Sequence, residues 1–337
     1  MKRPYPGLTP LAALVTTVLD NGARASIVDA TLEDIRAARA KVYPTSPPFS
    51  WITGRVSGRV TIDEGSAPVR DGAQIPLRWY TPMTRRAGRP VVVYFHGGGW
   101  VQGSTQMYDP LCSNLAEELD AVVVSVDYRM APEHRAPTAS FDAIDVTRWI
   151  HDNPQRGADT DRIAVCGDSA GGNLSAIVAQ ELRDLRTADG EPVIRHQALI
   201  YPATDLTMAS PSIAEHADGA ILTEPKIRAF RAHYLGDADD AVAMTDPIVS
   251  PLFGDVAGVA PALIQTADLD PIRDDGLRYA DVLRAAGVPV RVTNYLRVPH
   301  GFASMPGVTR IGEQSRHELV TELRTHLAKG VERAPSA

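Results

Sequence analysis

The segment that most constrains the fold is Gly167-Asp168-Ser169-Ala170-Gly171, a Gly-x-Ser-x-Gly motif. An apolar run ending at Cys166 precedes it, and a run compatible with a helix, 174–185, follows it. A strand that turns sharply into a helix holds the serine in a strained turn, with its hydroxyl outside the sheet. Cβ atoms at the two glycines would clash where strand and helix pack. A chain of this length yields about a tenth of a chance match, so the motif needs partners elsewhere.

Composition limits the classes of protein to consider. The 337 residues, 44% of them hydrophobic, fit one large α/β domain with a small accessory piece. The net charge of −7 and the lack of a basic cluster argue against nucleic acid or an anionic membrane as partner. The two cysteines, Cys112 and Cys166, support no disulfide framework, and we expect a cytoplasmic protein. No apolar run approaches the roughly 18 residues of a membrane span.

The N-terminal region allows two interpretations. Lys2 and Arg3 precede the apolar run 11–19, and Ala23-Arg24-Ala25 resembles a cleavage site, as in a signal peptide. Prolines interrupt the approach, however, and threonines break the apolar run. An amphipathic helix over residues 9–20 is favoured because four apolar residues fit one helical face: Leu11, Leu14, Val15 and Val18.

Strand and helix patterns alternate along the rest of the chain. A second helix is predicted at 30–41, with Leu32, Ile35 and Ala38 on one side, before a connector at 43–50. Strands are predicted at 59–62, 75–80, 91–95, 121–126, 163–166, 196–201, 261–266 and 289–295. Further helices are predicted at 107–119, 138–152, 225–234, 275–286 and 312–328. This alternation predicts an α/β fold whose mainly parallel sheet carries its site at the carboxyl ends of the strands.

A glycine loop directly follows the strand predicted at 91–95. In His96-Gly97-Gly98-Gly99-Trp100, three glycines allow backbone N–H groups to turn towards a ligand. Such donors stabilise the negative oxygen that forms when a nucleophile attacks an ester carbonyl. A tight turn or a phosphate cradle is the alternative. A phosphate loop ends in Gly-Lys-Ser/Thr before a helix, and that ending is missing.

A serine nucleophile needs an acid and a base, in the chain order Ser, Asp/Glu, His. Among nine histidines, His300 stands out because it follows the strand predicted at 289–295, so we expect it to be the base. The preceding strand ends near Asp268 and Asp270, and Asp270 comes before a proline at a turn. Asp274 and Asp275 are typical of a first helical turn. These patterns favour Asp270 and leave Asp268 open.

Together the motifs resemble those of the hormone-sensitive-lipase-like group of α/β-hydrolases, the bacterial family IV carboxylesterases. The segments that carry the resemblance are 96–104, 127–134, 167–172, and 270–276 with 300–302. The resemblance implies an α/β-hydrolase fold with about eight strands and a small helical cap. It places the nucleophile at Ser169, the acid at Asp270 and the base at His300, which decides against Asp268. It also implies oxyanion-hole donors at the N–H groups of Gly97, Gly98 and Ala170.

The resemblance also divides the chain. It implies N-terminal cap helices and a linker at 1–55, a first core part at 56–204, a second cap segment at 205–245 and a second core part at 246–337. His96 and Asp168 are expected to hold loops by hydrogen bonds. Four aromatic residues are candidates either for the substrate pocket or for the core: Trp100, Tyr201, Tyr234 and Phe302.

The expected function is that of a serine carboxylesterase acting on a small-molecule ester with a short to medium acyl chain. No metal and no organic cofactor is expected, and the resemblance allows a homodimer. Hydrolysis of lactones, amides or lipids by the same residues is the alternative. A ligand-binding protein without catalysis is a further alternative, and the presence of His300 argues against it.

Overall fold

The computed structural model describes residues 7–22, 26–236 and 241–328. Eight strands form one sheet in the order β1-β2-β4-β3-β5-β6-β7-β8. Their bounds are β1 Val60–Pro68, β2 Gln74–Pro82, β3 Arg89–Phe95, β4 Val122–Val126, β5 Ala158–Asp168, β6 Ile194–Ile200, β7 Ala262–Leu269 and β8 Val290–Pro299. β2 runs antiparallel to both β1 and β4, and the other neighbours are parallel. The predicted fold class is confirmed.

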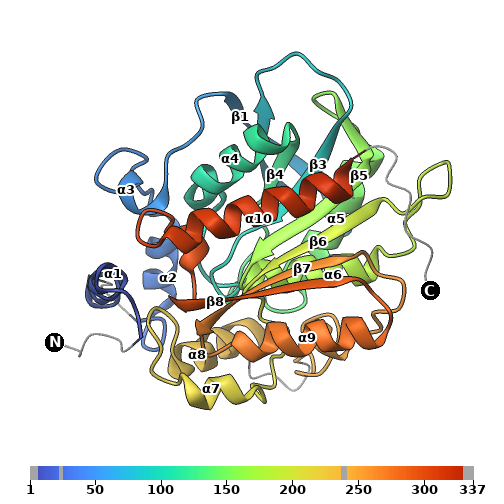
Figure 1. Ribbon diagram of the computed structural model, residues 1–337. Coiled ribbons are helices and arrows are strands. Elements are labelled where there is room, and N and C mark those ends of the chain that lie inside the picture. Colours follow the sequence, from blue (N-terminus) through green and yellow to red (C-terminus); the bar gives the residue numbers. More distant parts are fainter. Residues whose placement is uncertain (1–6, 23–25, 237–240, 329–337) are drawn as a thin grey trace.

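Helices cover both faces of the sheet (Figure 1). α4 (Asp109–Leu119) and α10 (Arg310–Leu327) pack on one face, and α5 (Thr138–Asp152), α6 (Ala170–Glu181) and α9 (Arg273–Ala285) pack on the other. Strand β3 shows why both faces are apolar: Val91 and Val93 join the α5–α6 side, and Val92 and Tyr94 join the α4–α10 side. Because successive side chains point to opposite faces, a strand buried on both sides must be apolar throughout.

Some element bounds differ from those predicted. β1 continues six residues beyond the predicted end at 62, because its exposed, polar second half still pairs with β2 through the backbone. α6 starts at Ala170, directly after the serine. Two short helices were missed, α3 (Ser50–Thr53) near the end of the predicted connector and α7 (Pro211–Glu215) in the 205–245 segment. Short helices bury few residues and leave little periodicity to detect.

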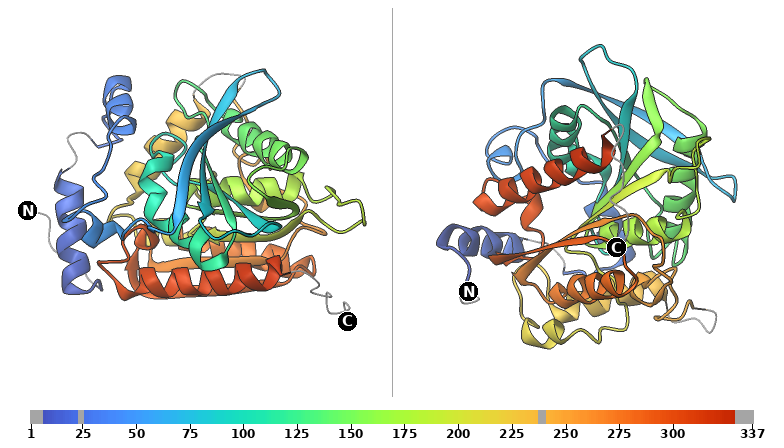
Figure 2. Two further views of the ribbon diagram at one scale, coloured as in Figure 1. Left: turned by 90° about the horizontal axis from the view of Figure 1, so that it is seen from above. Right: turned by 45° about the vertical axis from the view of Figure 1, so that its right-hand side comes forward.

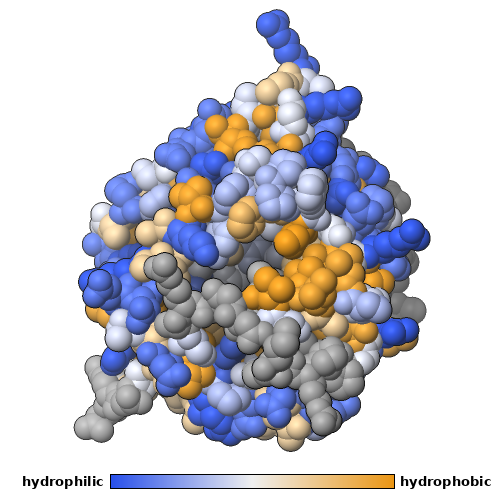
Figure 3. All heavy atoms as spheres, turned by 90° about the vertical axis from the view of Figure 1, so that its left-hand side faces the viewer, coloured by the Kyte–Doolittle hydropathy of each residue, from blue (hydrophilic) through white to orange (hydrophobic). Residues whose placement is uncertain are grey.

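The N-terminal helices, α1 (Pro10–Gly22) and α2 (Leu32–Arg39), lie at one end of the molecule (Figure 2). α1 is present as predicted, but of the four residues on its apolar face only Val15 packs against a buried cluster. Leu11, Leu14 and Val18 are 52%, 62% and 61% exposed, and apolar side chains gather on the face of the molecule that carries this end (Figure 3). α1 instead buries small residues, Ala12 and Ala13, which fit closely against the rest of the chain.

α2 buries only one of its three predicted contact residues. Ile35 is fully buried, whereas Leu32 and Ala38 are exposed. The cluster under α1 also contains Ala220, so the two predicted cap segments touch each other, although the division of the chain into four parts stays a prediction. The residues that resemble a cleavage site, 23–25, lie outside the described ranges. Within those ranges, no helix is long and apolar enough to cross a membrane.

Candidate active site

Ser169 lies in a strained turn between β5 and α6. Its φ of 55° and ψ of −117° fall in a region that residues with a side chain rarely adopt. Gly171 makes this turn possible, because a Cβ atom there would collide with the carbonyl oxygen of Phe95 on β3. The strand–turn–helix geometry expected from the motif is therefore present, and it directs the serine hydroxyl out of the sheet at the carboxyl end of β5.

Two long-range hydrogen bonds connect Ser169, His300 and Asp270. His300 Nε2 lies 2.9 Å from Ser169 Oγ, and His300 Nδ1 lies 2.7 Å from Asp270 Oδ2. Asp270 is fully buried, and His300 is 7% exposed. Because an ionised carboxylate only accepts, Nδ1 donates to Asp270 and Nε2 is left to accept the serine proton. The loops after β5, β7 and β8 thus bring together three residues that are far apart in the sequence.

The structure also shows that Asp270 and the other candidate acids have different hydrogen-bond partners. Asp270 Oδ1 accepts the N–H of Ile272 at 2.9 Å, which leaves Oδ2 for His300. Asp268 Oδ1 accepts the N–H of Val298 at 3.2 Å and so holds the end of β8, two residues before His300. Asp274 and Asp275 lie in the first turn of α9, as predicted.

The oxyanion-donor prediction needs one correction. The N–H of Gly97 donates to Asp168 Oδ1 at 2.9 Å and contacts the hydroxyl of Tyr108 at 3.1 Å, so it is not free for a substrate. Among the described residues, the N–H groups of Gly98, Gly99 and Ala170 have no hydrogen-bond partner. Gly98 has a φ of +127°, and a Cβ atom there would collide with the carbonyl oxygen of Gln102. Three consecutive glycines indicate a donor loop, but they do not show which N–H groups face the serine.

Asp168 anchors this loop from below. Besides the N–H of Gly97, its carboxylate accepts the hydroxyls of Tyr94 at 2.8 Å and Tyr108 at 2.9 Å. Burial raises the pKa of the Asp168 carboxyl, and these hydrogen bonds act in the opposite direction. The expectation that Asp168 holds a loop by hydrogen bonds is confirmed.

His96 supports the same loop from the other side. Its Nδ1 donates to the carbonyl of Gly97 at 2.8 Å, and its ring stacks on Tyr128 with centroids 4.5 Å apart. Burial lowers the pKa of His96, which favours the neutral ring. The hydroxyl of Tyr128 donates to the carbonyl of His96 at 2.7 Å. The side chains of Asp168 and His96 therefore fix the path of the glycine loop without facing Ser169.

Comparison with known proteins agrees with this geometry. Residues 92–304 match a family described by its alpha/beta hydrolase fold. Esterase LipI of Mycobacterium tuberculosis is 43% identical over 262 residues, which are 76% of this chain and 80% of the relative. The chain belongs to the hormone-sensitive-lipase-like carboxylesterases. Carboxylesterase NlhH of the same species is 39% identical over 274 residues, which are 81% of this chain and 83% of the relative. The hyperthermophilic esterase of Pyrobaculum calidifontis superimposes with a TM-score of 0.80 at 36% identity, over 94% and 98% of the two chains.

In this carboxylesterase a small cavity of about 40 Å³ adjoins Ser169. Its walls are mainly apolar and come largely from residues 205–231, a segment whose pattern did not reveal a pocket. The lining side chains from this segment include Leu206, Met208, Ile213, Leu222, Ile227 and Phe230. Sequence reasoning missed these residues because apolar side chains on a short helix or a loop are equally typical of core packing.

One of the four aromatic candidates lines this cavity. Trp100 does so, and its ring stacks on Tyr234 with centroids 4.5 Å apart. Tyr234, Tyr201 and Phe302 are fully buried and do not line this cavity, which favours the core alternative for all three. Tyr201 still serves the site indirectly, because its ring packs 4.7 Å from that of His300.

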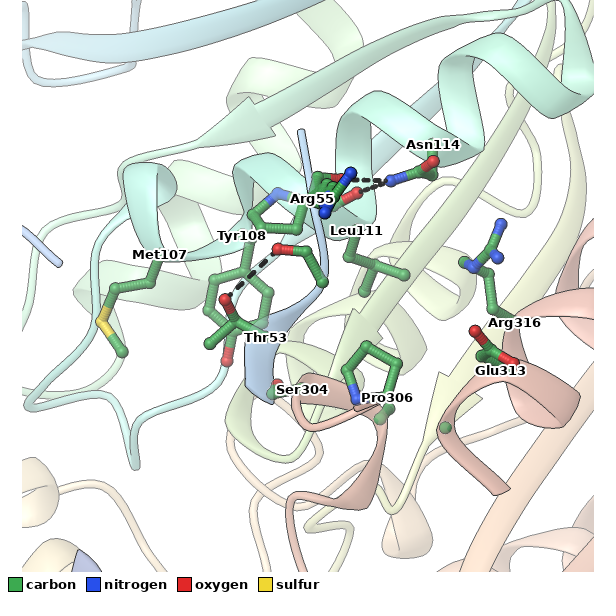
Figure 4. A pocket seen from close by; sticks show the side chains of 14 residues that line it. Thr53, Arg55, Met107, Tyr108, Leu111, Asn114, Ser304, Pro306, Glu313 and Arg316 are labelled. Atoms are coloured by element: carbon green, nitrogen blue, oxygen red, sulfur yellow. Dashed lines mark hydrogen bonds between the residues drawn. The ribbon is translucent and has the colours of Figure 1, made fainter. Parts of the chain in front are cut away.

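A larger cavity of about 180 Å³ lies between α3, α4 and α10 (Figure 4). Thr53, Tyr108 and Pro306 are among its lining residues, and its described lining includes no member of the Ser–His–Asp set. Asn114 closes one side by donating to the carbonyl of Arg55 at 2.8 Å. Tyr108 connects this cavity to the active site, because it contacts Asp168 and Gly97.

Proposed function

We propose that this chain hydrolyses carboxylic esters with short to medium acyl chains through Ser169, His300 and Asp270. The observation that carries the proposal is the continuous hydrogen-bonded path, 2.9 Å from Ser169 to His300 and 2.7 Å from His300 to Asp270. A nucleophile, a base and a group that orients the base are then in contact before substrate arrives.

The reaction follows from these contacts. His300 Nε2 takes the proton of Ser169 as Oγ attacks the ester carbonyl, and Asp270 stabilises the charged ring without taking its proton. The N–H groups of Gly98, Gly99 and Ala170 receive the negative oxygen in place of the predicted set with Gly97. The alcohol leaves with the proton from His300, a water molecule repeats the attack on the acyl-enzyme, and the acid is released.

The cavity beside Ser169 favours the short end of the acyl range. One water-sized group needs about 10–15 Å³, so a volume of about 40 Å³ holds about three such groups. Longer chains need the side chains from the 205–231 segment to move, or must leave through the open side. We therefore expect kcat/KM to fall as the acyl chain grows beyond about four carbons.

The decisive experiment replaces the nucleophile. Ser169→Ala should lower kcat by roughly 10⁶, as in other serine hydrolases, while Ser66→Ala, an exposed serine on β1, should leave activity unchanged. A fluorophosphonate probe should label the wild-type chain and Ser66→Ala, but not Ser169→Ala. Retention of a tenth of wild-type activity in Ser169→Ala would overturn the proposal.

A substrate panel separates the alternatives. Nitrophenyl esters of increasing acyl length, lactones, anilides and an emulsified triglyceride should rank with the short esters first. A preference for lactones, anilides or emulsions would replace the proposed substrate class while keeping the same catalytic residues. Absence of both turnover and probe labelling would indicate the non-catalytic binding protein instead. The homodimer and the cytoplasmic location remain predictions.

A further inference from the structure

Three side chains with metal-ligating atoms meet at the end of the sheet away from Ser169. They are His196 on β6, and Glu322 and His326 near the end of α10. Their ligand atoms all lie within 4.8 Å of one another. His196 pairs with Ala164 on β5, four residues before Asp168, so it lies about 13 Å back along the strands from the catalytic end. The cluster therefore has no part in the ester chemistry.

Fold and sequence together create this cluster. Glu322 and His326 are four residues apart, so they share one face of α10. His196 has the same strand parity as Ala198 and Ile200, which pack with α10 on that side of the sheet. The ring of His196 accordingly stacks on that of His326, with centroids 4.3 Å apart and planes 12° apart.

His196 is the unexplained member. Its side chain is fully buried, and within the described ranges neither ring nitrogen has a hydrogen-bond partner. A buried polar group without a partner is unfavourable, and most such groups are satisfied in native proteins. An imidazole nitrogen that carries no proton has a lone pair that a metal ion can accept.

We propose that His196, Glu322 and His326 bind one divalent transition-metal ion, with Zn²⁺ the best match. Two imidazoles and one carboxylate form an N/O set that Zn²⁺ accepts in tetrahedral geometry. The ion gives a buried nitrogen of His196 the partner it lacks. It ties the last turn of α10 to β6 and so stabilises the C-terminal end of the described fold.

Geometry and charge permit binding. Ligand bonds of about 2.1 Å place tetrahedral ligand atoms about 3.4 Å apart. Glu322 Oε2 and His326 Nε2 are already 3.7 Å apart. An imidazole binds a metal ion in the plane of its own ring, so one of the two stacked rings must turn before both can hold the ion. His326 and Glu322 are 28% and 15% exposed, so they have room to turn towards His196 while the fourth position stays open to water. Arg291 contacts the other oxygen, Oε1 of Glu322, at 2.8 Å, and the carboxylate of Glu318 offsets its positive charge.

Metal binding to the full chain, freed of metal by a chelator, tests the proposal. Zn²⁺ is titrated against a colorimetric chelator of known affinity, and Co²⁺ is followed by visible absorption. The wild-type chain should bind one ion per chain, show the intense bands of four-coordinate Co²⁺, and gain melting temperature with Zn²⁺. His326→Asn and Glu322→Gln should each weaken binding at least tenfold and lose most of the thermal shift. Esterase activity should stay unchanged in all of them.

Two further variants keep the outcome clear. His317→Asn removes an exposed histidine from the same helix and should bind Zn²⁺ like the wild type. His196→Leu should abolish binding, yet leave the metal-free chain at least as stable, because it removes an unpartnered buried group. The proposal is overturned if the wild type binds no Zn²⁺ at micromolar concentrations, or if His326→Asn and Glu322→Gln bind as well as His317→Asn does.

Discussion

Two regions are held in place in different ways: the segments around Ser169, which form the floor of the active site, and the N-terminal helices α1 and α2, here called the cover. Around Ser169 the turn and the glycine loop are fixed by buried contacts: Gly171 packs on Phe95, and the Asp168 carboxylate accepts three hydrogen bonds. The cover is attached more loosely, because α2 buries a single residue, Ile35. The catalytic geometry is thus enforced by the sheet, whereas the pocket depends on a few side chains that can vary without disturbing the chemistry.

The largest effect after loss of the nucleophile should come from the acid beneath it. Asp270→Asn should lower kcat by about 10⁴, because the amide favours the wrong tautomer of His300. Asp268→Asn keeps an acceptor for the N–H of Val298, so its kcat should change by less than tenfold. Steady-state kinetics on a short nitrophenyl ester measures both. Equal losses in the two variants would remove the distinction between an acid and a loop anchor.

An intermediate effect is expected at the anchor of the glycine loop. Asp168→Ala removes three hydrogen bonds, those that the carboxylate accepts from the hydroxyls of Tyr94 and Tyr108 and from the N–H of Gly97. At about 1 kcal/mol or more for each group, the free energy of unfolding should fall by about 3 kcal/mol. Because the donors of Gly98 and Gly99 then shift, kcat should fall about 10-fold to 10²-fold.

The matched variant Tyr94→Phe removes a single donor and should lose about a third of that stability, with little change in kcat. Urea denaturation and initial rates on the same preparations decide the matter. A loss of stability in Asp168→Ala without any loss of kcat would show that the loop holds its catalytic shape unaided.

The smallest effect should be found where α2 contacts the segment that follows the glycine loop. Arg39 donates from Nε to the carbonyl of Val101 at 2.7 Å and from Nη1 to Glu133 at 2.9 Å. Arg39→Met should lower the free energy of unfolding by about 1–2 kcal/mol and change kcat/KM by less than tenfold, mainly through KM. Arg36→Met removes only an exposed ion pair to the same Glu133 and should stay within about 0.5 kcal/mol of wild type. A large fall in kcat for Arg39→Met would mean that the cover helps to set the catalytic geometry.

Prediction from the sequence succeeded where local signals were strong. The strands were found because their runs are either apolar throughout or alternate with a period of two, and Ser169 was found because its turn requires glycine on both sides. The apolar stripe of α1 was found correctly, but the sequence did not show that most of this stripe is exposed. The contact surface instead admits the small Ala12 and Ala13 and leaves Leu11 and Leu14 outside. Hydrophobic periodicity shows which residues share one face of a helix. It does not show the shape of the surface against which the helix packs.

The sequence by itself determined the parts and their order: a glycine loop, a serine in a sharp turn, an aspartate and a histidine, each after a strand. Those features are local, so neighbouring residues are enough to specify them. Only the tertiary structure decided that the N–H of Gly97 donates to Asp168, 71 residues away. It leaves the N–H groups of Gly98 and Gly99 without a hydrogen-bond partner. It alone brought side chains of residues 205–231 to Ser169 and His196 to α10. These pairings depend on which distant segments share a face, and that is settled only when the sheet is complete.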